Sequence, residues 1–376
     1  MTRRTLLRRV GTAGAAGTVG LSAAVSASLS APAIAQSAPT LRWRMATSWP
    51  GSLDTLYGGA ERFADFVADA TNDKFRIECY PAGALQGVPS LQVTEAVSAG
   101  TVELCHTAPY YMAGSDPTFA LACAVPFGLN GRMQSAWWRE GGGEQLINRF
   151  YAKHNIFGLL AGNTMAQMGG WFRKEIQSAD DLKGVKMRIG GFAGTVMARL
   201  GVIPHQLPGG EILAALEKGA IDAAEWVGPH DDEKLGLHKV AKYYYYPGWW
   251  EGGAMLHVQV SKTRWDELPP SYKAILGAAA TEATAFIVGR YDARNPLALK
   301  RLVAAGTQLR PFSETTMDVC YRAANTVYAE IGGKNEDFKR IWDSIRAFRA
   351  DQYLWLQVAD STYDNYMIVQ QRKHTL

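Results

Sequence analysis

Arg188 is the residue whose type and position point most directly to chemistry. It lies one residue before the end of the strand-like run VKMRI at residues 185–189. A guanidinium is planar and permanently charged, and it offers a carboxylate two parallel N–H donors that a lysine cannot supply. At the mouth of a cleft, this side chain would bind a carboxylate ligand. Position alone also allows a surface arginine that pairs with Asp180 or Glu225.

Motifs of the common enzyme classes do not accompany this arginine. The seven histidines show no HExxH spacing, and no G-x-S-x-G nucleophile elbow follows the leader. The glycine pairs at 190–191 and 209–210 lack the G-x-G-x-x-G spacing of dinucleotide sites. The run His230–Glu233 could hold a divalent ion, but such a run usually marks a polar helix start. The pattern therefore favours ligand binding over catalysis.

Residues 180–226 contain the elements that must position Arg188. The run predicts a strand at VKMRI, a helix at TVMARLG, an extended segment at VIPHQLP, a helix at EILAALEKG and a strand at AIDAAEW. Gly201 and Gly219 stand where helices commonly end. Strands that alternate with helices predict an α/β fold with parallel strands, which bind ligands at their carboxyl ends.

The same stretch resembles the signature of the TRAP-transporter solute-binding proteins, the DctP-type periplasmic receptors for organic acids. The resemblance rests on DLKGVKMRI, a following A-x-L-G and GGEILAALEKGAIDAAEW, together with TSWP at 47–50, YPAGALQG at 80–87 and EGGAMLHVQVSK at 251–262. It covers most of residues 40–330. Because several elements agree at their proper offsets, the signal is more specific than a short motif.

The branch that binds 2-oxo and 2-hydroxy acids with a metal ion is the most similar, and it implies a role for each site residue. Arg188 would grip the ligand carboxylate. Glu225 would be an anionic metal ligand, Trp226 would add its backbone carbonyl, and Gln167 would add an amide oxygen. Glu251 would be a second carboxylate, or would instead bond a backbone group. Gln167 and Trp226 would therefore contact the substrate as well as the ion.

The ion implied by this ligand set is a hard cation, Na⁺ or Ca²⁺, since the ligands are all oxygens. Two carboxylates with an anionic substrate would favour Ca²⁺, whereas one carboxylate would suit Na⁺. The ion would also bind the carboxylate and the 2-oxo or 2-hydroxy oxygen of the substrate. The choice between the two ions stays open, as does the choice among pyruvate, lactate and longer acids.

Three further residues are candidates for contact with the ligand. Tyr111 follows the strand VELCHTAP and could supply an apolar wall and a hydroxyl donor, and Trp171 is a second wall candidate. Asn163 follows the strand IFGLLAG and is either a donor to the ligand or a simple turn residue. The chain has eleven tryptophans, so any one of them is more often a core residue than a ligand contact.

The first 35 residues read as an export leader. Arg3 and Arg4 begin a twin-arginine-like pattern, a weakly apolar run follows, and Ala33-Ile34-Ala35 is an A-x-A cleavage site. An ordinary Sec leader with extra arginines is the alternative. The leader holds four of the 39 basic residues and no acid, so the remaining chain has 35 basic and 35 acidic residues. A neutral chain implies no nucleic-acid partner, and the leader predicts a periplasmic protein.

The length of the exported chain predicts two lobes with a cleft between them. We assign residues 36–162 and 253–312 to lobe I and residues 163–252 to lobe II. A long helix that links the lobes should run from Pro269 to about Arg294 and be interrupted at Pro296. Residues 313–376 would form C-terminal helices. The four cysteines have no framework spacing, so buried free thiols are expected.

The C-terminal tail from Glu336 to about Arg372 is too rich in apolar residues to be free in solvent. It should dock on the receptor itself or on a second copy, and a helix-mediated homodimer is the favoured form. The sequence thus predicts a non-enzymatic TRAP receptor that delivers a 2-oxo acid to a membrane permease. A metal-dependent periplasmic lyase acting on oxo acids and a receptor for a dicarboxylate are the alternatives.

Overall fold

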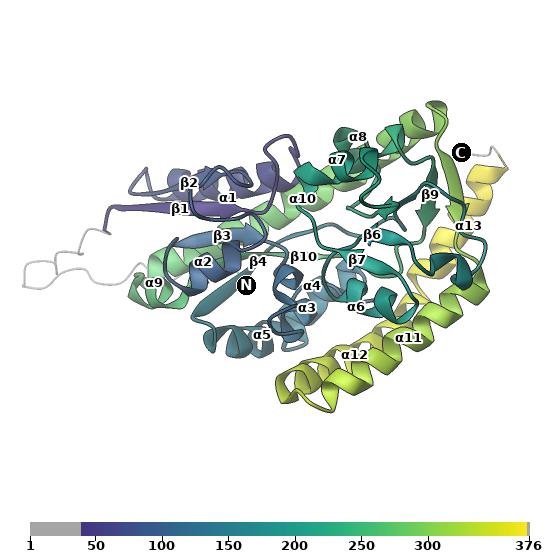
Figure 1. Cartoon of the computed structure of the whole chain (residues 1–376). Coiled ribbons are helices and arrows are strands. Elements are labelled where there is room, and N and C mark those ends of the chain that lie inside the picture. The colour runs from purple at the N-terminus through teal and green to yellow at the C-terminus, as the bar shows by residue number, and fades with distance from the viewer. Residues whose placement is uncertain (1–38, 374–376) are drawn as a thin grey trace, which may run out of the picture. The chain divides into compact units, whose positions relative to one another are not determined.

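The computed structural model describes residues 39–373, and Figure 1 shows the path of the chain. The predicted export leader, residues 1–35, lies outside the described residues. Among residues 39–373, no helix combines the length and the apolar character needed to cross a membrane. The described part is an α/β fold built on two sheets, as the sequence predicted.

The first sheet, which defines lobe I, has the strand order β2-β1-β3-β10-β4. Its strands are β1 (Leu41–Thr47), β2 (Phe75–Tyr80), β3 (Leu104–Thr107), β4 (Ile156–Asn163) and β10 (Met255–Ser261). β1 pairs in parallel with β2 and β3, whereas β10 is antiparallel to both β3 and β4. The chain thus returns to the first sheet after building most of the second.

Helices lie between the strands of lobe I and after its last strand. They are α1 (Leu56–Ala70), α2 (Val93–Ser98), η1 (Pro109–Met112), α3 (Thr118–Leu121), α4 (Gly131–Glu140), α5 (Gly143–Ala152) and α9 (Lys262–Glu267). α1 is preceded by a turn in which Leu53 N donates to Pro50 O at 3.0 Å. The Asn130 side chain caps α4 by accepting from Met133 N at 2.9 Å.

The second sheet, which defines lobe II, has the order β11-β9-β5-β8-β6-β7. Its strands are β5 (Trp171–Phe172), β6 (Lys186–Arg188), β7 (Ile203–His205), β8 (Ala223–Ala224), β9 (Tyr243–Tyr246) and β11 (Gln308–Pro311). β6 is parallel to β7 and β8, and β5 is antiparallel to β8 and β9. Our assignment of residues 308–311 to lobe I was wrong, because β11 covers the free edge of β9 in parallel.

Short helices connect the strands of lobe II. They are η2 (Ala179–Leu182), α6 (Gly191–Arg199), η3 (Gly209–Glu211), α7 (Ile212–Glu217), α8 (Pro229–Leu235) and η4 (Leu237–Lys239). Gly201 (φ +85°) and Gly219 (φ +69°) follow α6 and α7 in the left-handed conformation that commonly ends a helix. The predicted alternation of strands and helices over residues 180–226 is therefore confirmed.

The long helix α10 (Pro270–Ala304) packs against α1 and β4 of lobe I and against α8 of lobe II. In Figure 1 it extends from the first sheet to α8. The predicted break at Pro296 does not occur. Both Pro296 and Asp292, whose carbonyl loses its intrahelical donor, are exposed, so water can satisfy that carbonyl. Buried Tyr291, Ala298 and Leu302 hold the helix on both sides of the proline.

The C-terminal segment forms three helices, α11 (Glu314–Gly332), α12 (Glu336–Leu356) and α13 (Asp360–Arg372), of which α12 and α13 make up the tail. α12 begins at the Asn335 cap and contacts α3, α4, α5 and α11, with Phe338, Ile341, Trp342 and Ile345 buried. The tail thus docks partly on its own chain, as one of the two predicted arrangements requires. Its later apolar residues are exposed, including Tyr353, Leu354, Trp355, Val358, Tyr363, Tyr366, Ile368 and Val369.

The cysteines in the described residues are free thiols, as predicted. Cys105, Cys123 and Cys320 are buried, and Cys79 is half-buried. Burial raises the pKa of the Cys79 thiol to about 12 and that of Cys320 to about 12. These thiols are therefore protonated at neutral pH, which makes them poor nucleophiles and poor metal ligands.

Candidate functional site

The ends of β6 and β8 bring Arg188 and Glu225 together. The two strands are parallel neighbours, with Arg188 beside Ala224, so Glu225 is the next residue along. The backbone N–H of Glu225 donates to Arg188 O at 3.1 Å. Two side chains that are 37 positions apart in the sequence therefore meet because the carboxyl ends of parallel strands lie at one edge of the sheet.

Arg188 and Glu225 form a fully buried ion pair. Arg188 Nη1 donates to Glu225 Oε1 and, at 2.6 Å, to Glu225 O, while Nε donates to Leu207 O at 3.2 Å. Gly190 N donates to the same Oε1 at 2.8 Å, and the guanidinium lies over the Trp226 ring, 4.8 Å from its centroid. The pair is thus held on several sides and has little freedom to reorient.

Burial and charge act in opposite directions on this pair. Burial works to lower the pKa of Arg188, but the charge of Glu225 and those of the other acidic groups nearby together outweigh burial, and the pKa is raised. Burial raises the pKa of Glu225, and the charge of Arg188 opposes that rise without cancelling it. The arginine is therefore always charged, whereas the carboxylate is a group that a second positive charge would stabilise.

Gln167 and Glu251 form the second polar part of the site. Gln167 Nε2 donates to Glu251 Oε2 at 2.7 Å and to Thr164 Oγ1 at 3.0 Å, and both side chains are buried. The pKa of Glu251 lies well above its usual value, first because of burial and then because of the charge of Glu225. Two carboxyl groups that repel each other in a buried site are a suitable setting for a cation.

Four buried polar atoms around these residues have no hydrogen-bond partner among residues 39–373. They are two acceptors, Gln167 Oε1 and Glu225 Oε2, and two donors, Arg188 Nη2 and Trp226 Nε1. Buried polar atoms in native proteins are nearly always satisfied, and an unsatisfied one costs about 1–3 kcal/mol. Free oxygens suit a cation and free N–H groups suit an anion, so this set fits a cation and a carboxylate bound side by side.

A small cavity with a volume of about 10 Å³ is lined by Gln167 and Trp226, but not by Arg188, Glu225 or Glu251. Both lobes line it, with Trp49, Leu56, Ala108, Tyr110, Tyr111, Ala254 and Leu256 from lobe I or its connections and Thr164, Gln167, Trp226 and Val227 from the segments of lobe II. That volume is about the room that one water molecule needs, so a bound acid would require the walls to move apart.

The predicted wall residue Tyr111 does line the cavity, whereas Trp171 and Asn163 do not. Trp171 stacks on Tyr244 at 3.9 Å, and its Nε1 donates to Asp232 Oδ2 at 2.9 Å. Asn163 donates to Gln134 Oε1 at 2.8 Å and accepts from Met165 N at 2.8 Å. Both side chains are thus committed to the interior, and their prediction as ligand contacts is not supported. Asn163 instead fixes the turn that follows β4, because its side chain accepts from the backbone N–H of Met165.

Trp49 is a cavity residue that the sequence analysis did not single out. It follows β1, so the rule that ligands bind at the carboxyl ends of strands would have found it. Its indole Nε1–H donates to His106 Nδ1 at 2.8 Å, and His106 Nε2 donates to Ala161 O at 3.1 Å. Burial lowers the pKa of His106 to about 4, so this histidine is neutral and can accept the indole proton. A buried histidine thereby fixes the orientation of the wall.

The family of the chain follows from a comparison with known proteins. Residues 45–335 match DctP, the bacterial extracellular solute-binding proteins of family 7. The chain belongs to this family of solute-binding proteins, which confirms the resemblance seen in the sequence.

Three similar proteins have known ligands or a descriptive name. The chain is 50% identical over 328 residues to the monocarboxylate 2-oxoacid-binding periplasmic protein of Nostoc sp., covering 87% of this chain and 89% of that protein. A TRAP solute-binding protein from Bordetella bronchiseptica is 46% identical, with a TM-score of 0.87 over 89% of this chain and 99% of its own. That structure is a dimer with calcium and picolinate at one active site. A protein from Pseudoalteromonas atlantica with bound sodium and pyruvate is 34% identical, with a TM-score of 0.83 and coverages of 87% and 99%.

Proposed function

We propose that this protein is the periplasmic receptor of a TRAP transporter and binds a short 2-oxo acid, such as pyruvate, together with Na⁺ or Ca²⁺. The observation that carries the proposal is the set of free buried acceptors and donors beside a small cavity shared by both lobes. The described similarity to a 2-oxoacid-binding protein and to a sodium–pyruvate complex supports the same ligand class.

The cation would be held by oxygens of Gln167, Glu225, Glu251 and the backbone of Trp226. No group of three or more acidic, histidine or cysteine side chains that could hold a metal occurs in residues 39–373. The site therefore depends on neutral amide and carbonyl oxygens and on the bound acid itself, which is how Na⁺ and Ca²⁺ are commonly held. When bound, the ion would neutralise the repulsion between the two carboxyl groups and attract the ligand carboxylate.

The ligand itself would lie with its polar end toward lobe II. Arg188 Nη2 and Trp226 Nε1 are the free donors for its carboxylate or its 2-oxo oxygen. Its alkyl end would then face the apolar side of the cavity, which lobe I lines with the aromatic ring of Trp49 and the aliphatic side chain of Leu56. A short alkyl group matches that wall, whereas a second carboxylate there would be buried without a partner.

Binding would be coupled to closure of the lobes. Because the cavity has walls from both lobes, a bound acid makes all its contacts only when they are shut, and it shifts the equilibrium toward that form. We propose that the shut form is the one presented to the membrane permease of the transporter. The same receptor is proposed to form a homodimer through the exposed apolar residues of α12 and α13.

A thermal-shift screen tests the proposed ligand class. Protein freed of ligand by unfolding and refolding would be mixed with monocarboxylates, 2-oxo acids, 2-hydroxy acids, dicarboxylates and sugars, each with Na⁺, Ca²⁺ or EDTA. A ligand at a thousandfold its Kd adds about 4 kcal/mol to the free energy of unfolding, which raises Tm by several degrees. We expect a large shift confined to 2-oxo or 2-hydroxy acids and weakened by EDTA in sodium-free buffer.

Other results of the screen would contradict parts of the proposal. A rise in Tm produced by dicarboxylates or sugars would support the receptor role but would reject the proposed pocket in which a cation and a 2-oxo acid bind together. No shift with any acid would reject the receptor role. The lyase alternative would then be tested by following the NMR signals of pyruvate for conversion to a product.

A further inference from the structure

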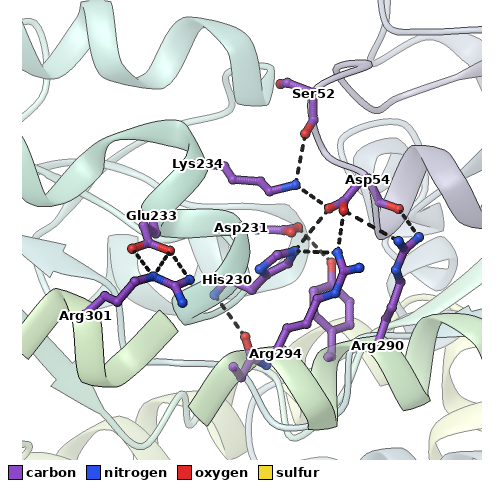
Figure 2. Close-up of polar contacts among 11 residues, drawn as sticks. Ser52, Asp54, His230, Asp231, Glu233, Lys234, Arg290, Arg294 and Arg301 are labelled. Carbon is purple, nitrogen blue, oxygen red and sulfur yellow. Dashed lines mark hydrogen bonds and ion pairs between the residues drawn. The ribbon is translucent and has the colours of Figure 1, made fainter. Parts of the chain in front are cut away.

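Asp54 lies at a junction between the lobes that is outside the ligand cavity. It belongs to the turn between β1 and α1 in lobe I, whereas α8 belongs to lobe II and α10 packs on both. Figure 2 shows side chains from α8 and α10 converging on this turn. The turn is therefore bound by α8 of lobe II and by the helix α10 that contacts both lobes.

The donors around Asp54 satisfy both its side chain and its backbone. Lys234 Nζ and Arg294 Nη1 form ion pairs with the two carboxylate oxygens, and His230 Nε2 lies 3.1 Å from Oδ1. Arg290 Nη1 donates to Asp54 O at 3.0 Å. Lys234 Nζ also reaches the carbonyl of the neighbouring Ser52 at 3.4 Å, so the whole turn is held (Figure 2).

Asp54 is charged over the whole pH range in which a periplasmic protein works. Burial acts to raise its pKa, but hydrogen bonds from Lys234, His230 and Arg294 outweigh burial, and the pKa falls far below its ordinary value. His230 itself is buried, which lowers its pKa and keeps it neutral near pH 7. The junction is thus one carboxylate shared by three permanent cations, and these cations repel one another when the carboxylate leaves.

The turn that carries Asp54 is also connected to the cavity on both sides. Trp49 lies five residues before it and Leu56 two residues after it, and both line the cavity. Holding the turn against α8 therefore holds two parts of the apolar wall in place. Opening of the lobes would have to separate Asp54 from His230 and Lys234, because these residues belong to α8 of lobe II.

We infer that Asp54 is a positioning residue for ligand binding, which retains the bound acid by holding the lobe I turn against α8 and α10 without contacting the ligand. The affinity readout rests on the proposed function. Because the contacts of Asp54 with His230 and Lys234 of α8 form only after the lobes close, Asp54 should slow release of the ligand and leave its association rate nearly unchanged.

The test compares Asp54→Asn with a matched control, Glu233→Gln. Glu233 pairs with Arg301 through bonds of 2.6 Å and 2.9 Å between the same two helices, α8 and α10, but this pair does not involve the lobe I turn (Figure 2). Pyruvate release would be followed by stopped-flow tryptophan fluorescence with Ca²⁺ or Na⁺ present. We expect Asp54→Asn to raise the release rate about tenfold, because a network of partly exposed pairs contributes more than one isolated pair.

Three further results separate a positioning role from a general loss of structure. Glu233→Gln should release pyruvate at the wild-type rate. Asp54→Glu should release pyruvate more slowly than Asp54→Asn does. Added choline chloride should speed release from the wild type more than from Asp54→Asn, because salt screens the ion pairs of Asp54. Equal release rates for wild type, Asp54→Asn and Glu233→Gln would overturn the inference. An increase in the release rate that is the same for Asp54→Asn and Glu233→Gln would also overturn it.

A ligand-free measurement keeps the inference testable if pyruvate does not bind. Amide hydrogen exchange in residues 49–57 would be compared for the same three proteins without any acid. Faster exchange in Asp54→Asn than in Glu233→Gln would support the junction, whereas identical exchange would contradict it. Failure of the wild type to bind any acid would reject the proposed function but would leave this comparison intact.

Discussion

Replacement of Arg188 by lysine is the substitution whose effect the geometry defines most sharply. In the structure the guanidinium makes three kinds of contact with the chain, to Leu207 O, Glu225 O and Glu225 Oε1, and Nη2 is left free for a ligand. A lysine ammonium is one point donor on a flexible stem, so it can keep the charge near Glu225 but cannot also fill the ligand-facing position.

The magnitude follows from what the lysine variant loses. One charge-assisted hydrogen bond to the ligand carboxylate is worth about 1.5–3 kcal/mol, which is a loss in affinity of about 10- to 150-fold. Arg188→Met would also leave Glu225 buried without its partner. Such a change costs about 3–5 kcal/mol in the free energy of unfolding, so the methionine variant should lose stability as well as affinity.

Isothermal titration with pyruvate and thermal unfolding without ligand separate the two effects. We expect Arg188→Lys to keep most of its Tm and to bind pyruvate far more weakly, whereas Arg188→Met should lose both. Wild-type affinity in Arg188→Lys would refute the assignment of Nη2 to the ligand. A fall in Tm as large as that of Arg188→Met would show that the lysine fails in its structural role instead.

Three other predictions concern the wall, a buried acid and the tail. Trp49→Ala should enlarge the apolar side of the cavity, so titrations should show tighter binding of 2-oxo acids with longer alkyl chains relative to pyruvate; an unchanged ranking would reject Trp49 as the wall. Asp231 accepts from Tyr291 at 2.7 Å, and burial raises its pKa to about 7. Between about pH 4 and 7 the folded state therefore binds a proton that the unfolded state has released, so the free energy of unfolding should fall as the pH rises through this range. The fall should reach about 1.4 kcal/mol per pH unit. Urea titrations at several pH values should show a flatter slope for Asp231→Asn. Trp355 is 55% exposed, and Trp355→Asp should convert a dimer to a monomer in sedimentation experiments; a wild type that is already monomeric would contradict the proposed homodimer.

The central pair of the site could be predicted because local pattern and sheet geometry agree. VKMRI and AIDAAEW were each identifiable as strands, and their glycine-terminated helices implied parallel neighbours. Parallel pairing then requires Arg188 and Glu225 to meet, as they do. That Gln167 and Glu251 also meet depends on the path of two loops, and the family resemblance supplied this where the local pattern could not.

The errors have a common physical source, which is tertiary packing that a local pattern does not contain. Pro296 reads as a helix break, yet its exposed position lets water take the freed carbonyl while buried residues hold the helix. Trp171 lies at a strand in lobe II, but stacking on Tyr244 and a bond to Asp232 direct its ring into the interior. β11 belongs to the second sheet because it pairs with the edge of β9, which lies about 60 residues earlier in the chain.

The most direct test of the central claim is the coupling between the cation and the acid. Pyruvate would be titrated into ligand-free protein with and without Ca²⁺ or Na⁺, and the cation would be titrated with and without pyruvate. If both occupy one site, each must raise the affinity of the other by the same factor, and we expect that factor to be at least about tenfold. Pyruvate affinity that is identical in EDTA with no sodium, or a cation that binds without regard to pyruvate, would contradict the shared site.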